Sequence, residues 1–422
     1  SMSQQALMEM VISQLSDENQ ATFKDSQGHY LDITDWECIR MVNDTVHTFD
    51  FDDISVTPGS DKPENQGTIN LKWLPETTSS VHVNDRGLEG TMNCSEFPRG
   101  MCTCGIANNR LTGSLEFSLL PPELEAIDFC ENFFSGTVDL IHLSDRLLEL
   151  SFDQNQLHGT LNLTKLPKNL KRLGASDNQF CGTIDLTSLP PYFNHLILHT
   201  NKFQGTVNLT CLPQTMTSLV LYSNSLSGTV NLTQLPLNLI DLYLNDNNFS
   251  GDVCLTHLPG LMQKLGFGGN SFRGTIDIVL LCEDVLEVSL EENTFHGSLD
   301  LASLPRQVQA FSAKENRFEG TVDLVHLPDT LTELFLGSNL FHGDLHLEFL
   351  PLQLKKLHLD GNSFDGTLFL GQFPRDLEEL KIEKNLLKSK VHLQDGSLVT
   401  KRKSFFGTAF YEKAKKLLLR FE

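Results

Sequence analysis

Apolar and polar residues alternate in a fixed order along most of the chain. Residues 235–255 read LPLNLIDLYLNDNNFSGDVCL, which follows the pattern L-P-x-x-L-x-x-L-x-L-x-x-N-x-F-x-G-x-V-x-L. Side chains of a strand point alternately to opposite faces, so the L-x-L segment predicts a short strand with Leu242 and Leu244 directed inward. The outward positions of this strand are Asp241, Tyr243 and Asn245.

The pattern repeats with a constant length. Glycine recurs every 23 residues from Gly67 to Gly366, in 14 copies without a change of phase. Asparagine stands four residues before the glycine from Asn109 through Asn385. A period in this range predicts stacked turns that form a solenoid, with a parallel sheet whose edges lie only at its two ends. Proline stands eight residues after the glycine and is replaced at Ser144 and Cys282.

Each repeated residue has a structural explanation. The asparagine is expected to hydrogen-bond backbone groups that have no strand partner inside the turn, forming a ladder along the stack. Glycine allows a turn conformation that a Cβ would hinder, and proline suits a stretch outside the sheets because it has no N–H. An aromatic residue two positions after the asparagine is expected to form a stacked interior row, at Phe180, Phe203, Phe249, Phe272, Phe295, Phe318, Phe341 and Phe364.

Over residues 46–393 the repeat resembles the leucine-rich-repeat family, whose core pattern is L-x-x-L-x-L-x-x-N-x-L. The added G-T-V/I-x-L segment is similar to the plant-type subclass, which has a second short strand. The resemblance implies an α/β-type repeat solenoid that is curved and right-handed. A parallel β-sheet is expected on its concave face, irregular chain or short strands on its convex side, and helical caps at both ends.

Both ends of the chain depart from the repeat, as terminal turns must to cover the core. Residues 4–23 are predicted to form a helix, and residues 35–51, DWECIRMVNDTVHTFDF, resemble the family's N-terminal cap pattern W-x-G-V-x-C. Glu37 and Arg40 stand where that pattern has Gly and Cys, so its disulfide is not expected. The positions that match the cap in spacing are Trp36, Val46, Phe49 and Phe51.

Three regions are predicted. Residues 1–66 form a helical cap, a first strand and an insertion at Pro58 to Gln66; residues 67–393 form the solenoid; and residues 394–422 form a basic helical cap. In the last region, residues 401–422 hold seven basic and two acidic residues, which is a local charge of +5. The net charge of the whole chain is −22, so the remaining residues carry −27. A helix over Phe405 to Phe421 is expected to close the last turn.

Composition narrows the classes of function and compartment. The net charge of −22 argues against binding of DNA or RNA, which needs a basic surface. No apolar run approaches 20 residues, so membrane insertion is not expected. The start lacks a secretory signal, which favours a cytoplasmic or nuclear protein. Ser1 before Met2 resembles a cloning remnant, so an extracellular or cell-surface location remains the alternative if an upstream signal was trimmed.

No constellation of residues indicates catalysis, a cofactor or a metal. The chain has no phosphate-binding, zinc-protease, serine-hydrolase or calcium-loop motif. His195 and His199 are four residues apart on a predicted strand, about 13 Å, which is too far for one ion. The nine cysteines do not suggest a disulfide framework, and Cys94 and Cys104 are expected to be reduced core thiols. The sequence therefore indicates a protein that is not an enzyme.

Specificity is expected on the outward positions of the L-x-L strands. Early turns are acidic there and late turns are charged, whereas the central turns are apolar and aromatic, as in protein interfaces. The alternative is a solvated sheet stabilised by apolar cross-strand pairs. The favoured function is a monomeric scaffold or adaptor that binds a protein partner, and the alternative is an extracellular recognition or adhesion module. The predicted partner-binding residues are His195, Ile197, His199, Val220, Tyr222 and Tyr243.

Overall fold

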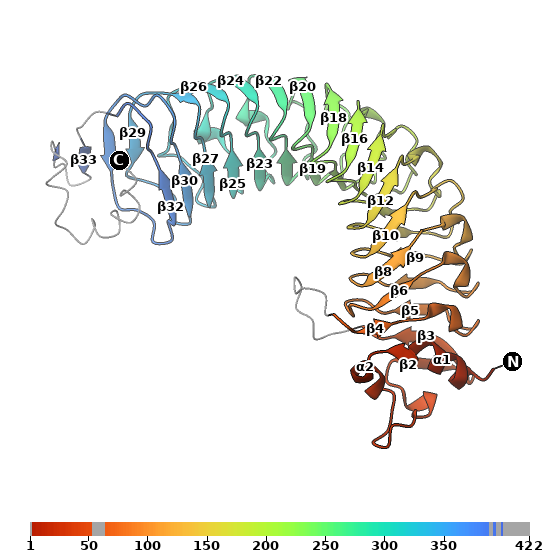
Figure 1. The fold of residues 1–422 in the computed structure, drawn as a ribbon. Coiled ribbons are helices and arrows are strands. Elements are labelled where there is room, and N and C mark those ends of the chain that lie inside the picture. Colours follow the sequence, from red (N-terminus) through yellow and green to blue (C-terminus); the bar gives the residue numbers. More distant parts are fainter. Residues whose placement is uncertain (1, 53–63, 388–390, 394–397, 400–422) are drawn as a thin grey trace. The chain divides into compact units, whose positions relative to one another are not determined.

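The computed structural model describes residues 2–52, 64–387, 391–393 and 398–399. The chain divides into two compact units, unit 1 up to Gly205 and unit 2 from Thr206 onward. Each unit is a stack of turns in which two parallel sheets run along the stack (Figure 1). We call the sheet formed by the L-x-L strands the first-strand sheet and the other the second-strand sheet.

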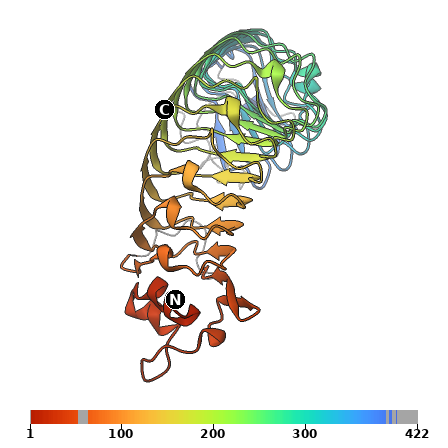
Figure 2. The ribbon, with the colours of Figure 1, turned by 90° about the vertical axis from the view of Figure 1, so that its right-hand side faces the viewer.

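Unit 1 begins with helices and continues as stacked strands, whose two rows Figure 2 shows along the stack. Its helices are α1 (Gln4–Ile12) and α2 (Asp17–Ala21) and the 3-10 helices η1 (Ile33–Asp35), η2 (Leu71–Trp73), η3 (Cys94–Glu96), η4 (Phe117–Leu119) and η5 (Leu163–Lys165). Its first-strand sheet contains β2 (Ile39–Val42), β3 (Thr45–Asp50), β5 (Ser80–His82), β7 (Thr103–Gly105), β9 (Ala126–Asp128), β11 (Glu149–Ser151), β13 (Arg172–Gly174) and β15 (His195–Ile197). Its second-strand sheet contains β1 (Gln14–Leu15), β4 (Gly67–Thr68), β6 (Glu89–Thr91), β8 (Arg110–Gly113), β10 (Phe133–Gly136), β12 (Gln156–Gly159), β14 (Gln179–Gly182) and β16 (Lys202–Gly205).

Unit 2 has the same plan, with β20 to β26 along one edge of the stack in Figure 1 and β19 to β27 along the other. Its 3-10 helices are η6 (Leu209–Cys211), η7 (Ile278–Leu280) and η8 (Leu301–Ser303). Its first-strand sheet contains β17 (Ser218–Val220), β19 (Asp241–Tyr243), β21 (Lys264–Gly266), β23 (Glu287–Ser289), β25 (Ala310–Ser312), β27 (Glu333–Phe335), β30 (Lys356–His358) and β32 (Glu379–Lys381). The remaining strands are β18 (Ser225–Gly228), β20 (Asn248–Asp252), β22 (Ser271–Gly274), β24 (Thr294–Gly297), β26 (Arg317–Gly320), β28 (Leu340–Phe341), β29 (Leu345–Leu347), β31 (Leu368–Leu370), β33 (Val391–Leu393) and β34 (Leu398–Val399).

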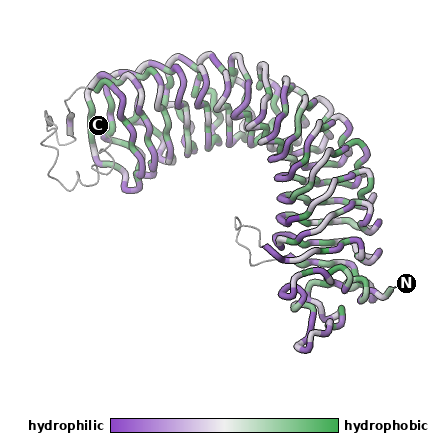
Figure 3. Tube along the Cα trace, viewed as in Figure 1, coloured by the Kyte–Doolittle hydropathy of each residue, from purple (hydrophilic) through white to green (hydrophobic). Residues whose placement is uncertain are grey.

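The inward and outward assignments of the L-x-L strands are confirmed. Leu242 and Leu244 are fully buried, whereas Asp241, Tyr243 and Asn245 are half-exposed. Figure 3 shows the same alternation of apolar and polar residues through the turns of each unit. Burying the leucines removes their side chains from water, which stabilises each by about 1.5–3 kcal/mol relative to leaving it exposed.

The asparagine ladder and the phenylalanine row are also confirmed within each unit. Asn247 donates from Nδ2 to the carbonyl oxygens of Leu221 and Leu244, at 3.0 and 3.2 Å, and its Oδ1 accepts from the backbone N–H of Leu226 at 2.9 Å. Phe249 and Phe272 are stacked, with ring centroids 6.1 Å apart and an interplanar angle of 12°. The turns are therefore joined both by buried hydrogen bonds and by aromatic contact.

The position of the second strand differs from the sequence expectation. In most turns the strand precedes the repeated glycine and ends at it, as in β22, and does not start with the G-T-V/I-x-L segment. Gly228 shows the reason, because β18 ends at it and its φ is +85°, a conformation that ends an extended strand. A Cβ there would also lie 2.7 Å from Cγ2 of Thr206, one turn earlier. The threonine methyl therefore packs against the place that glycine leaves open.

The single helix predicted over residues 4–23 is wrong. The segment forms α1, then the two-residue strand β1, then α2. Ser16 starts the second helix, because its hydroxyl accepts from the backbone N–H of Asn19 at 3.3 Å. The strand between the helices pairs antiparallel with β4, with Leu15 opposite Gly67. Residues 14–15 form a strand instead of continuing the helix, because pairing with β4 covers the edge of the second-strand sheet.

The remainder of the N-terminal cap agrees with the prediction. Trp36, Val46, Phe49 and Phe51 are buried, and Trp36 donates from Nε1 to the carbonyl oxygen of Leu31 at 3.1 Å. Cys38, within the cap motif, is a free thiol. Most of the predicted insertion, residues 58–63, lies outside the described residues, and so does the predicted basic cap at residues 394–422 apart from Leu398 and Val399.

Candidate functional site

Two tyrosines lie side by side on the outward face of the first-strand sheet of unit 2. Tyr222 follows β17 and Tyr243 ends β19, and their rings form a T-shaped pair with centroids 6.4 Å apart at 75°. Val220 is the register partner of Tyr243 across the same two strands. All three side chains are half-exposed. We call Tyr222 and Tyr243 the tyrosine pair.

Tyr243 is also bound into a polar contact network. Burial raises the pKa of its phenol, against the opposing effect of the ammonium group of Lys264 beside it. Nζ of Lys264 lies 3.5 Å from Oε1 of Glu287 on the next strand. The tyrosine, the lysine and the glutamate thus follow one another across β19, β21 and β23. The Tyr243 phenol therefore lies at the edge of a charged group of side chains.

Next to the tyrosine pair, two of the three outward positions of the following L-x-L segment are glycines. The third is Lys264, at the start of β21; Gly266 ends β21, Gly268 lies just beyond it, and both glycines are buried. Gly269 occupies the turn that follows with φ of +63°. We call Gly266, Gly268 and Gly269 the glycine strip. The Asn245 side-chain amide from β19 and Ser289 Oγ from β23 meet over the strip at 2.6 Å. Sequence reasoning missed this strip, although the segment LGFGGN at 265–270 contains its signal.

The last strands of unit 2 carry a lattice of paired charges. Nζ of Lys356 lies 2.9 Å from Oε1 of Glu333, and Nε2 of His358 lies 2.9 Å from Oε2 of Glu379. Phe335 packs against the His358 ring with centroids 4.7 Å apart. A partly exposed ion pair such as that of Lys356 with Glu333 contributes about 0–1 kcal/mol. The polar side chains of this part of the face therefore already have partners among their own neighbours.

The other three predicted site residues, His195, Ile197 and His199, lie in unit 1 on β15 and just after it. Nδ1 of His199 lies 3.5 Å from Oδ2 of Asp177. Burial lowers the pKa of the imidazole, although the carboxylates of Asp177 and Asp153 oppose this effect. The structure thus brings three predicted residues together within each unit, and the six-residue partner site remains a prediction.

The acidic early turns of unit 1 hold a thiol between carboxylates. Sγ of Cys130 lies 3.3 Å from Oδ2 of Asp153, and the Cys130 backbone N–H donates to Oδ1 of Asp128 at 2.9 Å. Burial, followed by the two negative charges, raises the pKa of the Cys130 thiol far above its usual value. The other oxygen of Asp153, Oδ1, accepts from the N–H and hydroxyl of Ser176, both at 2.6 Å. These acids therefore have internal partners that the sequence did not reveal.

The cysteines are all free thiols in very different environments. Cys94 and Cys104 are buried, as predicted for residues that replace leucine, and burial raises the pKa of Cys94 to about 11. Cys181, Cys211 and Cys254 are exposed. Cys181 lies in β14, Cys211 ends η6, and Cys254 follows β20.

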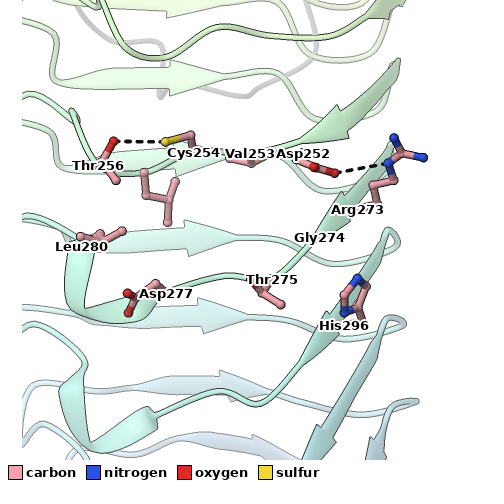
Figure 4. A pocket seen from close by; sticks show the side chains of 11 residues that line it. Asp252, Val253, Cys254, Thr256, Arg273, Gly274, Thr275, Asp277, Leu280 and His296 are labelled. Carbon is pink, nitrogen blue, oxygen red and sulfur yellow. Dashed lines mark hydrogen bonds and ion pairs between the residues drawn. The ribbon is translucent and has the colours of Figure 1, made fainter.

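A hollow of about 590 Å³ lies on the second-strand side of unit 2 (Figure 4). Asp252 and Arg273 face each other across its rim at 3.3 Å, and Sγ of Cys254 lies 3.1 Å from Oγ1 of Thr256. Among the described residues, no group of three or more His, Cys, Asp or Glu side chains is arranged to hold a metal. The lining residues are Asp252, Val253, Cys254, Leu255, Thr256, Arg273, Gly274, Thr275, Asp277, Leu280 and His296.

In the described part of the chain, none of the helices has the length and apolar character required to cross a membrane.

No protein-family model and no curated protein matches the sequence. Solved structures do match. YopM from Yersinia enterocolitica is 22% identical, with 74% of this chain and 70% of YopM covered and a TM-score of 0.51. A leucine-rich-repeat protein from Leptospira interrogans is 18% identical, with 83% of this chain and 84% of that protein covered and a TM-score of 0.50.

A third similar structure is the leucine-rich-repeat ectodomain of a plant membrane receptor kinase from Arabidopsis thaliana. It is 21% identical, the match covers 78% of this chain and 50% of that ectodomain, and the TM-score is 0.47. This chain therefore spans half the length of that ectodomain. Together, the repeat, the stacked parallel sheets and the first two matches define the fold class as a leucine-rich-repeat solenoid. The resemblance noted in the sequence is thereby confirmed at the level of fold.

Proposed function

We propose that this protein is a non-enzymatic scaffold that binds another protein on the outward face of its first-strand sheet. The observation that carries the proposal is the tyrosine pair, two half-exposed aromatic rings in T-shaped contact on neighbouring strands. Tyrosine supplies a large contact area with few rotatable bonds and is enriched among residues that dominate interface energies.

The fold supports this use of the face. The buried leucines, asparagines and phenylalanines supply the stability of each turn, so the outward positions of the strands are available for recognition. Around the tyrosine pair, Val220 adds apolar area, and Lys264 and Glu287 supply charge at its edge. An aromatic centre with a charged border has the composition of a protein interface.

The test compares partner capture by the double variant Tyr222→Ala/Tyr243→Ala with capture by the unaltered protein. A loss of about 2 kcal/mol in affinity, or roughly 30-fold, is expected for the captured partner at an unchanged melting temperature. Tyr192→Ala is the matched control, because Tyr192 is 61% exposed on a connecting segment of unit 1. Equal retention of the partner by both variants would move the binding site away from the tyrosine pair.

We further propose a cytoplasmic or nuclear location, with an extracellular recognition module as the second candidate. Cys94 and Cys104 support the first location, because they are free thiols buried in the core at leucine positions, and thiols stay reduced in the cytosol and nucleus. Exposed N-x-S/T sequences support the second; Asn162 is one, and its Oδ1 accepts from the backbone N–H of Thr164 at 3.0 Å. Mass measurement of the native protein with and without reductant and glycosidase separates the two, because only an extracellular form is expected to carry glycans.

A further inference from the structure

Three hydrogen-bonded side chains connect a thiol to an imidazole at the hollow of unit 2. Sγ of Cys254 lies 3.1 Å from Oγ1 of Thr256, and the same Oγ1 lies 2.7 Å from Nδ1 of His257. Cys254 and Thr256 line the hollow (Figure 4), and all three residues are exposed. We call Cys254, Thr256 and His257 the thiol network.

The repeat shows what an imidazole does at the position of His257. Three turns later, the equivalent histidine is His326, and Asp323 stands at the position of Cys254. Nδ1 of His326 lies 2.7 Å from Oδ2 of Asp323, and this hydrogen bond is the largest of the effects that lower the pKa of the Asp323 carboxyl. A histidine at this position therefore favours the anionic form of the residue three places before it.

In the thiol network, the hydroxyl group allows the same exchange of charge. The Cys254 thiol donates to Oγ1 of Thr256 while the hydroxyl donates to Nδ1 of His257, so one proton can leave the sulfur as another reaches the ring. Both hydrogen bonds then reverse, and the hydroxyl donates to a thiolate. The hydroxyl and the backbone N–H of Thr256 lower the pKa of the Cys254 thiol, as donation to the charged form requires. The thiolate is the nucleophilic form of cysteine.

We propose that Cys254 is a site of reversible S-thiolation, which reacts with a low-molecular-weight disulfide and keeps one half of it as a mixed disulfide. This inference goes beyond the proposed function and does not depend on it. The thiolate attacks one sulfur of the disulfide, so a new S–S bond forms at Sγ and the old S–S bond breaks. The leaving thiolate takes the proton from the His257 imidazolium and departs as a thiol. Cys254 is thereby oxidised, and the departing half of the disulfide is reduced.

The hollow supplies space for the group that stays attached. Its volume is about 590 Å³, and its lining combines polar side chains with the apolar side chain of Leu280. Asp252 and Arg273 pair with each other at its rim, at 3.3 Å. The remaining ionisable side chains of the lining are those of Asp277 and His296. A thiol of the size of a tripeptide therefore has both apolar and polar surface to contact beside the sulfur.

The probe is glutathione disulfide, added to the full, reduced chain at about pH 7, where an ordinary thiol is mostly protonated. Peptide mass spectrometry follows the modification of each cysteine with time. Cys181 and Cys211 are internal controls, because they are also exposed. Cys254 is expected to be modified at least about 3-fold faster than either, because its larger thiolate fraction outweighs the weaker nucleophilicity of a less basic thiolate. A reductant is expected to remove the added glutathione.

The contribution of the imidazole is tested by His257→Gln, which keeps a polar side chain but cannot take up the proton. His326→Gln is the matched control, since His326 is the equivalent residue beside Asp323. At about pH 7, His257→Gln is expected to slow the modification of Cys254 about 3-fold or more, and the control by less than about 1.5-fold. At about pH 9.5 an ordinary thiol is mostly ionised, so His257→Gln and the unaltered protein are expected to react at equal rates.

Equal rates at Cys254, Cys181 and Cys211 would overturn the inference, because Cys254 would then react as an ordinary exposed thiol. An equal loss of rate in His257→Gln at both pH values would also overturn it, since that result indicates altered local structure and not the loss of a proton acceptor. An unchanged rate in this variant at both pH values would exclude the imidazole from the reaction and overturn the inference as well.

Discussion

The side-chain amide of Asn247 donates to the carbonyl oxygen of Leu221 at 3.0 Å, joining one turn of unit 2 to the turn before it. With its other bonds, to Leu244, Asn245 and Leu226, this asparagine satisfies four backbone groups. Asn247→Ala is expected to lower the free energy of unfolding by at least about 1–3 kcal/mol, because it leaves buried groups without partners.

Asn248→Ala is the control for this change, since Asn248 is the next residue and is exposed. Its effect on stability is expected to stay within about 0.5 kcal/mol. Denaturant titration of both variants measures the difference. Equal losses would contradict the assignment of the ladder as the structural role of the repeated asparagine.

Thr200 adopts φ of +52°, in the left-handed region where a β-branched side chain is strained. The equivalent position four turns earlier is Asn108, at φ of +53°, and asparagine tolerates this region. Thr200→Asn is therefore expected to raise stability by up to about 1 kcal/mol, measured by thermal and chemical denaturation. Ser223→Asn, at the same φ but without branching, should gain less; a larger gain there would argue against the strain explanation.

Cys254 is expected to be alkylated well before Cys130. The hydroxyl and backbone N–H of Thr256 lower the pKa of the exposed Cys254 thiol, whereas burial and two carboxylates raise that of Cys130. The thiolate is the reactive form, so a lower pKa increases the reactive fraction near neutral pH. A time course with iodoacetamide, followed by peptide mass spectrometry, measures both rates.

The role of the hydroxyl in this reactivity can be tested separately. Thr256→Val should slow the alkylation of Cys254, because the thiolate loses a hydrogen bond. Thr233→Val is the matched control, since Thr233 makes the same contact to Asn231 in the preceding turn, at 2.7 Å. A rate for Cys254 that is unchanged by Thr256→Val would refute the proposed cause of its lowered pKa.

His199 is expected to titrate below the ordinary histidine value of 6.5, because burial of the imidazole is the largest effect on it. Since folding favours the neutral form, its contribution to stability is complete above the unfolded pKa and is lost as the pH falls through the folded pKa. NMR titration of the imidazole gives the midpoint. Asp177→Asn should lower the pKa further, because it removes an attraction that favours the charged ring; a rise would show that the sign is wrong.

Most of the fold was predictable because each turn repeats one solution to the same packing problem. Leu242, Asn247 and Phe249 are each required by the interior of their turn, so their spacing indicates their role without any knowledge of distant contacts. The broken N-terminal helix was not predictable in this way. It depends on the pairing of β1 with β4, more than fifty residues away.

The candidate site was predictable only in part. The outward positions of Tyr222 and Tyr243 follow from strand alternation, and so does the absence of side chains at Gly266 and Gly268. The meeting of Asn245 and Ser289 over the glycines depends on side-chain rotamers two strands apart, which no sequence pattern encodes. The pairing of Cys130 with Asp153 was missed for the same reason.

The hydrogen bonds of the asparagine ladder also determine how a protein of this kind can change in length. Oδ1 of Asn247 serves Leu226, in the preceding turn, and Oδ1 of Asn270 serves Phe249 in the same way. Removing one whole 23-residue turn brings the same donor and acceptor types back into contact, whereas removing a single residue displaces them. Within the ladder, from Asn109 to Asn385, a change in length is therefore expected to keep these contacts when it adds or removes a complete turn.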